Sequence, residues 1–213
     1  MKSIAALLLV SAYMAVQVSG HGRLMNPPCR ATMWRVGYDT PPDYNDNQLF
    51  CGGKSHQYDT QGGKCGICGD AYDEPQPRTH EIGGPYYKGI IVRNYAVGQE
   101  IKATVQITAN HLGFFQFKMC PVSGDVEATQ ECLDKHILTV AGTNSTDYYI
   151  TDEVRDFDVT LQLPEDLECE HCVFQWRYHA GNDWGVCPDG TGRDGCGPQE
   201  EFYGCADVSV SRP

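Results

Sequence analysis

Two histidines of this chain stand where they could bind a metal ion, and the first of them is His21. It follows Val18-Ser-Gly20, a run of small residues typical of the site at which a signal peptide is removed. Cleavage there makes His21 the first residue, so that its α-amine and its own imidazole Nδ1 can chelate one ion. The amine has a pKa of about 8, and losing its proton therefore costs little at neutral pH. Copper binds amine and imidazole nitrogens well, so this end of the chain favours a copper site.

The second histidine must come from another part of the sequence, and the chain holds seven in all. His111 ends the clearest strand pattern, where a rigid sheet passes into a loop and can hold a ligand in place. His179 stands near another predicted strand end and is a candidate hydrogen-bond donor to the site. The remaining histidines lie in polar stretches and are expected on the surface: His56, His80, His136 and His171. These residues alone leave two alternatives open, an accidental exposure of His21 and an ordinary core or surface role for His111.

The segments that would position these histidines follow a β pattern. In residues 100–109, apolar residues from Ile101 to Ile107 alternate with polar ones, which is typical of a half-buried strand. Similar patterns occur in residues 88–95, 113–119, 157–163, 172–178 and 205–210. Residues 21–85 are rich in Gly, Pro, Asn, Asp and Cys and predict long disulfide-tied loops, with at most short helical turns around residues 44–49. We therefore expect an all-β fold, an antiparallel β-sandwich of immunoglobulin-like or fibronectin-like type.

The start of the chain predicts export from the cell. Lys2 and the apolar run Ile4–Val10 have the form of a signal peptide, and the run is too short to span a bilayer. Residues 1–20 are thus expected to be removed, leaving a secreted, extracellular protein. Residues 21–213 contain no repeat and no linker, so we expect a single domain.

The charge balance limits the classes of molecule that the protein is expected to bind. The chain carries 28 acidic residues against 16 Lys and Arg. Nucleic acids and anionic membranes are bound through basic surfaces, so neither is an expected partner. An uncharged glycan is compatible with this balance, although acidic residues also serve solubility.

All eleven cysteines follow the predicted cleavage point. The extracellular compartment is oxidising, so we expect disulfides and one odd thiol. The pairs Cys65/Cys68 and Cys169/Cys172 have the spacing of a zinc site or a redox pair, but export disfavours both interpretations.

Several short motifs together resemble those of lytic polysaccharide monooxygenases. They are His21-Gly-Arg-Leu24, Ala109-Asn-His111, Gln175-Trp-Arg-Tyr178, Gly181-Asn-Asp-Trp-Gly185 and Phe202-Tyr-Gly-Cys-Ala-Asp207. Pro41 and residues 44–53 and 62–70 extend the likeness over essentially all of residues 21–213. The chain is most similar to auxiliary-activity family fifteen, which is found largely in invertebrates.

The resemblance implies one copper ion held by three nitrogens. His21 would supply its α-amine and Nδ1, and His111 would supply Nε2. Ala109, two residues before His111, matches a small residue that crowds one axial face of the copper in related bacterial enzymes.

An aromatic residue is expected at the opposite axial face, and the resemblance places Phe202 there, with Tyr203 as the alternative. Successive residues of a strand face opposite sides, so Tyr203 shares a face with Cys205. Cys205 should point into the protein to reach a disulfide partner, which leaves the ring of Phe202 for the copper. Gln175 and His179 are expected to lie around the ligands without binding the metal.

The implied activity is the oxidative cleavage of an insoluble polysaccharide. Copper would react with O2 or H2O2 after reduction by an external electron donor, and the substrate would be chitin, with cellulose as the alternative. A monomer with a flat binding face is expected, to which the exposed aromatic candidates Tyr38, Tyr44 and Trp184 could contribute. Two alternatives from other classes are a non-catalytic polysaccharide-binding or cuticle protein and a copper carrier. A glycoside hydrolase is disfavoured, because no motif brings two carboxylates together.

Two covalent features complete the expectations. We expect the pairs Cys29–Cys51, Cys65–Cys68, Cys120–Cys132, Cys169–Cys172 and Cys187–Cys205. Arg193 stands where relatives often carry a further cysteine, which leaves Cys196 as the expected odd thiol. Asn144-Ser-Thr146 is a glycosylation sequon, and Asn144 is expected to carry a glycan in an exposed loop.

Overall fold

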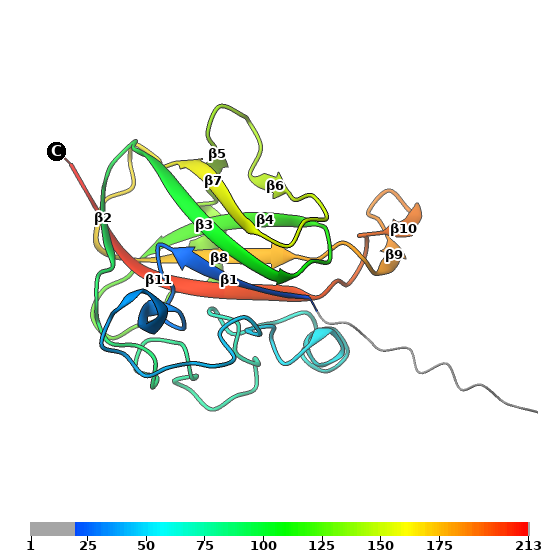
Figure 1. Cartoon of the computed structure of the whole chain (residues 1–213), viewed down its shortest axis with the longest axis horizontal. Coiled ribbons are helices and arrows are strands. Elements are labelled where there is room, and N and C mark those ends of the chain that lie inside the picture. Colours follow the sequence, from blue (N-terminus) through cyan, green and yellow to red (C-terminus); the bar gives the residue numbers. More distant parts are fainter. Residues whose placement is uncertain (1–19, 213) are drawn as a thin grey trace, which may run out of the picture.

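The computed structural model describes residues 20–212, and two β-sheets packed face to face form its centre (Figure 1). The smaller sheet has the order β1 (His21–Asn26), β3 (Glu100–Ala109), β7 (Asp156–Gln162) and β5 (Thr139–Val140). The larger has the order β2 (Arg93–Ala96), β11 (Glu201–Ser211), β8 (Cys169–His179), β4 (Phe114–Pro121) and β6 (Asp147–Tyr149). The predicted β-sandwich is confirmed. Its pairs are antiparallel except for β2 beside β11, which is parallel.

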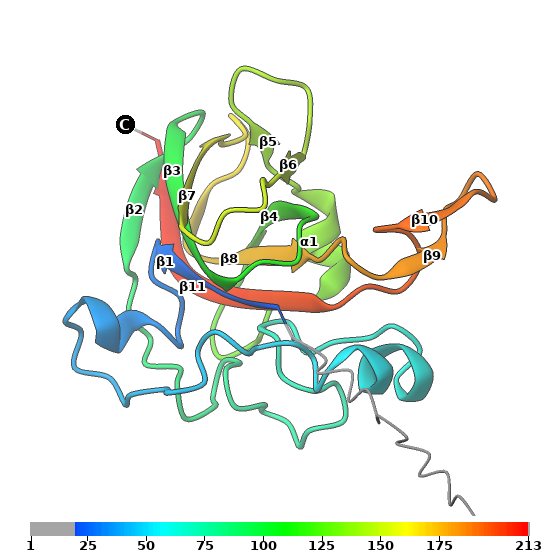
Figure 2. The ribbon, with the colours of Figure 1, turned by 45° about the vertical axis from the view of Figure 1, so that its right-hand side comes forward.

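A layer of loops and short helices covers the outer face of the larger sheet (Figure 2). It contains η1 (Met33–Val36) and η2 (His56–Thr60), while α1 (Gln130–Lys135) follows β4. A small hairpin of β9 (Trp184–Val186) and β10 (Gly192–Asp194) stands out from one end of the sandwich. Within residues 20–212, no helix is long and apolar enough to cross a membrane.

The core lies between the two sheets. The inward-facing residues of β3 from Ile101 to Ile107 are at most 3% exposed, as the alternating pattern predicts. They face aromatic side chains of the larger sheet, among them Phe115 and Trp176, which are fully buried. This apolar area is the main source of stability for the sandwich that carries the two histidines.

The prediction of loops from residue 21 onward is wrong for the first six residues. They form β1, which pairs with β3 from His21 opposite Ala109 to Asn26 opposite Thr104. Only Leu24 buries a large apolar side chain, and Gly22 is buried with the side chain of Ile107 close against it. So short a strand has no alternating pattern to detect. Near residues 44–49, where the sequence predicts at most a short helical turn, residues 44–47 form a non-helical turn, and the short helices of this region are η1 and η2.

Two of the five expected disulfides are present, Cys120–Cys132 and Cys169–Cys172. The other three pairings are wrong, because the structure has Cys51–Cys65, Cys68–Cys205 and Cys187–Cys196. The odd thiol is therefore Cys29 and not Cys196.

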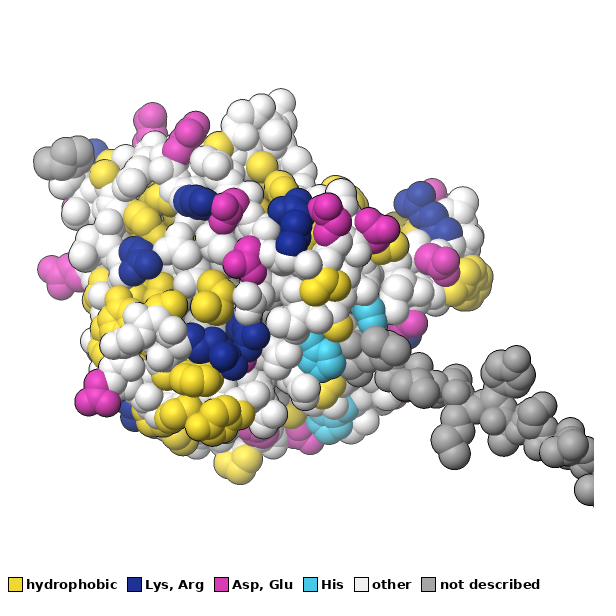
Figure 3. Space-filling model, viewed as in Figure 1, with side chains coloured by type: hydrophobic (Ala, Val, Ile, Leu, Met, Phe, Trp, Pro, Cys, Tyr) yellow, Lys and Arg dark blue, Asp and Glu magenta, His cyan; other side chains and the backbone are white. Residues whose placement is uncertain are grey.

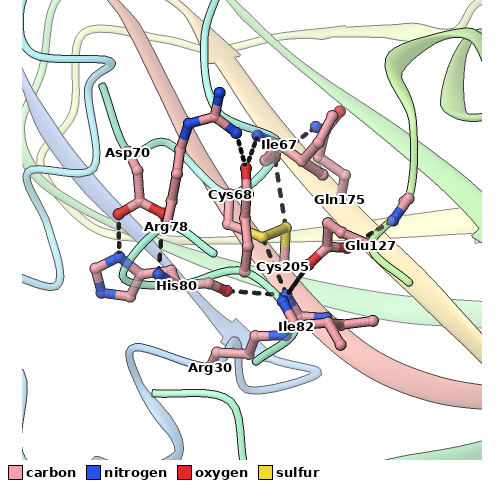
Figure 4. Close-up of a disulfide and its surroundings, with 12 residues drawn as sticks. Arg30, Ile67, Cys68, Asp70, Arg78, His80, Ile82, Glu127, Gln175 and Cys205 are labelled. Carbon is pink, nitrogen blue, oxygen red and sulfur yellow. Dashed lines mark hydrogen bonds and ion pairs between the residues drawn. A yellow bond between two sulfur atoms is a disulfide. The ribbon is translucent and has the colours of Figure 1, made fainter. Parts of the chain in front are cut away.

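Strand geometry explains this outcome. Cys29 is buried against Gly204 on the core face of β11. Cys205 points to the opposite face, where Cys68 of the loop layer meets it (Figure 4). Cys187 belongs to the hairpin and pairs within it.

Buried charges tie the loop layer to the sheet. Arg30 forms ion pairs with Asp207 of β11 at 2.7 Å and with Glu127 at 2.6 Å. His80 lies between the carboxylates of Asp70 and Asp43, at 2.6 and 3.1 Å. Figure 4 shows how several of these side chains surround the Cys68–Cys205 disulfide. The loops are thereby held in fixed positions relative to the strands.

Candidate functional site

Strand pairing brings the two candidate histidines to one end of the sandwich. His21 begins β1 and lies opposite Ala109, the last residue of β3. His111 follows two residues later in the loop that leaves β3. Antiparallel pairing places the start of one strand beside the end of its neighbour, so both histidines and Ala109 belong to the same edge.

The residue before His21 lies against the other candidates. Gly20 is buried, and a Cβ built on it would stand 3.1 Å from Cγ of His111 and 3.3 Å from Cε2 of Phe202. The backbone nitrogen of His21 is the next main-chain atom after the carbonyl carbon of Gly20. The chain therefore brings this nitrogen close to the rings of His111 and Phe202.

The backbone of His111 is fixed on both sides while its ring remains available. Its N–H donates to the hydroxyl of Tyr178 at 2.9 Å, and its carbonyl accepts the N–H of Gly181 at 2.8 Å. Nδ1 of the ring is buried without a hydrogen-bond partner, and within residues 20–212 no hydrogen bond uses Nε2. A buried imidazole with free nitrogens beside a second histidine is a fitting donor set for copper.

Phe202 occupies the core side of this cluster. Its side chain is fully buried, and its ring centre lies 6.4 Å from that of His21 and 5.6 Å from that of Tyr178. Tyr203 points to the other face of β11, and burial there raises the pKa of its hydroxyl. Of the two neighbouring rings, that of Phe202 is the one beside the histidines.

Glu200 is a residue of this cluster that the sequence did not reveal. Its Oε2 lies 3.4 Å from Nδ1 of His111 and accepts the N–H of Gly20 at 2.8 Å. The only signal in the sequence was that Glu200 lies two residues before Phe202, because residues two apart in a strand share a face. Placing Phe202 at the site therefore places Glu200 there as well.

Gln175 and His179 were expected near the ligands, and the structure does not bring them there. The core face of β8 carries Trp176 and Tyr178, so Gln175 and His179 point to the opposite face. Gln175 donates through Nε2 to the carbonyl of Ile67 at 2.7 Å, deep in the loop layer (Figure 4).

His179 belongs instead to a network around a buried carboxylate, Glu201. Nδ1 of His179 lies 2.7 Å from Oε1 of Glu201, which also accepts hydrogen bonds from Arg177 at 2.6 Å and Tyr58 at 3.1 Å. Burial acts to raise the pKa of Glu201, but the hydrogen bonds from Arg177 and His179 outweigh it and hold this pKa below its ordinary value. This network anchors the start of β11, between Glu200 and Phe202.

Two of the three aromatic candidates for substrate contact are exposed. Figure 3 shows histidine side chains reaching the surface near the start of β1, and hydrophobic side chains gathered elsewhere on the same view. Tyr44 is 78% exposed and Trp184, on the hairpin, is 66% exposed. Tyr38 is half-buried against the core, so Tyr44 and Trp184 are the better placed of the three candidates for surface contact.

Comparisons with known proteins agree with this geometry. Residues 21–208 match the family model described as lytic polysaccharide mono-oxygenase, cellulose-degrading. The structure is similar to that of the AA15 lytic polysaccharide monooxygenase from Thermobia domestica in the Cu(I) state, with a TM-score of 0.86 and 45% sequence identity. That alignment covers 90% of this chain and 99% of the other. A search of curated protein sequences found no match.

Proposed function

Because the chain belongs to the family of lytic polysaccharide monooxygenases, which are copper-dependent oxidative enzymes, we propose that His21 and His111 hold its copper. The observation that carries the proposal is the convergence of His21, His111 and Phe202 around the residue that precedes the mature N-terminus. We further propose that residues 1–20 are a signal peptide, although residues 1–19 lie outside the described part of the chain. Its removal would release a secreted protein.

Removal of Gly20 would convert the backbone nitrogen of His21 from an amide into an amine. An amide nitrogen lacks a basic lone pair, so only the processed chain offers three nitrogen ligands: the amine, Nδ1 of His21 and Nε2 of His111. Copper bound there would supply the reaction with O2 or H2O2 that breaks a C–H bond of the sugar. The space that Gly20 fills in the uncut chain would then open beside Phe202 and Glu200.

The side chains around the ligands have separate tasks. The phenyl ring of Phe202 would place carbon beside a copper ion held by the two histidines and exclude water from that side. Ala109, which pairs with His21, would add only a methyl group beside the bound ion. Glu200 places a carboxylate oxygen 3.4 Å from Nδ1 of His111.

The substrate is proposed to be an insoluble polysaccharide, chitin, with cellulose as the alternative. A crystalline polymer cannot enter a pocket, so it must lie across the end of the sandwich that carries the histidines. Exposed rings such as Tyr44 and Trp184 can stack on sugar rings there. Trp184 spreads its indole over Gly192, where any Cβ would collide with the ring at 2.5 Å, so the hairpin offers a flat aromatic face.

The deciding experiment incubates copper-loaded protein that begins at His21 with chitin or cellulose and ascorbate as electron donor. Mass spectrometry of the soluble fraction should find oxidised oligosaccharides, and omission of ascorbate should abolish them. Polymer binding without oxidised products would favour a non-catalytic binding or cuticle protein. Tight copper binding without turnover would favour a copper carrier.

Two further expectations belong to the exported protein. We propose that it acts as a monomer and that Asn144 carries a glycan. Asn144 is exposed in the bend before β6. Mass measurement of the peptide from a eukaryotic source would find a glycan on Asn144, and an unmodified peptide would refute this.

A further inference from the structure

A pocket of about 450 Å³ lies beside the loop that carries His111, and Phe202 is not among its lining residues. It opens between that loop and the β9–β10 hairpin, which stands out from the sandwich in Figures 1 and 2. Gly181 lines it and donates its N–H to the carbonyl of His111 at 2.8 Å. The pocket is thus separate from the group formed by His21, His111 and Phe202, but it lies next to the loop that carries His111.

One wall of the pocket is made of rings. Phe114 lies between Tyr149 and His179, with ring centres 5.4 and 4.9 Å away. Tyr149 is 72% exposed and is therefore free to contact a ligand. Such a wall binds the flat apolar face of a ring-shaped molecule.

The polar groups of the pocket have hydrogen-bonding capacity to spare. Glu201 holds Nδ1 of His179, which leaves Nε2 without a partner in the described part of the chain. On β10, Arg193 uses only its Nε, against the sulfurs of the hairpin disulfide, and the described residues provide no partner for the carboxylate of Asp194. His179, Arg193 and Asp194 all line the pocket and keep hydrogen-bonding groups unused within the described residues, and the charges of Arg193 and Asp194 are opposite.

The walls of the pocket are already held in place, and its floor leaves no room for a side chain of the protein. The hairpin wall is closed by Cys187–Cys196, and its base is tied by the Lys54–Asp183 ion pair at 2.5 Å. A Cβ on Gly113 would stand 2.0 Å from the carbonyl oxygen of His179, so no side chain can occupy this part of the floor. Binding of a ligand would therefore cost little conformational entropy in these walls.

We propose that this pocket is a carbohydrate subsite for one sugar ring of a soluble chain or of a loose chain end. A sugar ring has an apolar face for Phe114 and Tyr149, and hydroxyls for His179, Arg193 and Asp194. The cancelling charges favour a neutral ligand over an anion or a cation. A polysaccharide chain fixed in a crystal is too rigid to bend from the end of the sandwich that carries the histidines into the pocket, so the occupant is a mobile chain. This inference rests on the proposed action on polysaccharides.

The test titrates copper-free protein that begins at His21 with tetra-N-acetylchitotetraose and with cellotetraose in a calorimeter. The wild type should bind at least one of them. Tyr149→Ala and Asp194→Ala should each weaken that binding by about tenfold or more, the loss expected of an aromatic or hydrogen-bonding contact. Matched controls are Tyr72→Ala, which removes an exposed tyrosine elsewhere, and Asp189→Ala, which changes the tip of the same hairpin. Both should bind as the wild type does.

The remaining outcomes separate the two proposals. No binding of either oligosaccharide, or binding that neither pocket variant weakens, overturns the carbohydrate subsite. Binding of catechol at the pocket with no binding of sugar also overturns it, and would make the pocket a site for a phenolic electron donor. If the wild type still oxidises the polymer in these cases, the proposed function stands. Absence of polymer oxidation would refute the proposed function itself, whatever the oligosaccharides do.

Discussion

The hydroxyl of Tyr178 accepts the backbone N–H of His111 at 2.9 Å, so a buried core residue holds the second candidate ligand. Burial raises the pKa of Tyr178, which keeps this hydroxyl protonated. Tyr178→Phe should leave the N–H of His111 without a partner and lower the free energy of unfolding by about 1–3 kcal/mol.

Copper affinity should fall about tenfold in the same variant, as is usual when a partner of a metal ligand is removed. Chemical denaturation and copper titration would measure the two effects. The control is Tyr148→Phe, a partly buried tyrosine that stacks on Phe115 and whose hydroxyl has no partner in the described residues. Equal losses in both variants would contradict a specific role for Tyr178.

Copper binding should depend on cleavage before His21. A form with one extra N-terminal residue keeps an amide at this position, loses one of the three nitrogen ligands, and should bind copper at least about 100-fold more weakly, more than the loss of an outer partner costs. Isothermal titration of both forms would decide the matter. The same tight affinity for each would rule out the amine as a ligand.

His111→Ala should abolish oxidative activity while the fold persists. The residue lies in a loop after β3, and its ring contributes little to the apolar core. Product analysis and circular dichroism would be measured together, with His136→Ala as a control histidine outside the site. A fully active His111→Ala protein would show that another residue binds the metal.

The axial assignment is open to spectroscopy. Phe202→Tyr places an oxygen near the metal and should shift the electron paramagnetic resonance spectrum of the Cu(II) form. Tyr203→Phe should leave the spectrum almost unchanged, because Tyr203 faces the loop layer beside Arg177 and Glu201. The reverse pattern would assign the axial position to Tyr203.

Stability should depend on pH through His80. Burial acts to lower its pKa, but the carboxylates of Asp43 and Asp70 outweigh burial and raise the pKa to about 9. Because the folded pKa lies above the unfolded value of about 6.5, the stabilisation is complete below that value and is lost as the pH rises through about 9.

His80→Gln should therefore lower the melting temperature at pH 6 and have a much smaller effect at pH 10. Thermal unfolding over this range would measure the difference between variant and wild type. His56→Gln, which removes an ion pair at the surface, is the control and should change stability little at either pH. A His80→Gln effect that stays constant with pH would exclude a charged His80 as its cause.

Local patterns were sufficient for some parts of this protein. The alternation in residues 100–109 predicts β3 and its buried face, because a strand repeats every two residues whatever its neighbours are. The small residues before His21 and the position of His111 at a strand end make both histidines candidates, and the family resemblance, carried by several motifs together, selects them as ligands. These signals are carried by residues near one another in the chain.

Tertiary structure decided the rest, since strand alternation sorts residues into two faces but does not say which face meets which partner. Gln175 and His179 share the face of β8 opposite Tyr178, and only sheet packing shows that this face meets the loop layer. Glu200 reaches His111 across 89 positions of sequence, a contact created where the loop after β3 meets the segment that leads into β11. Cys205 pairs with Cys68, 137 residues away, because β11 turns that side chain toward the loops, and Cys29 is left unpaired on the other side. Such contacts depend on how distant segments pack, which no local spacing encodes.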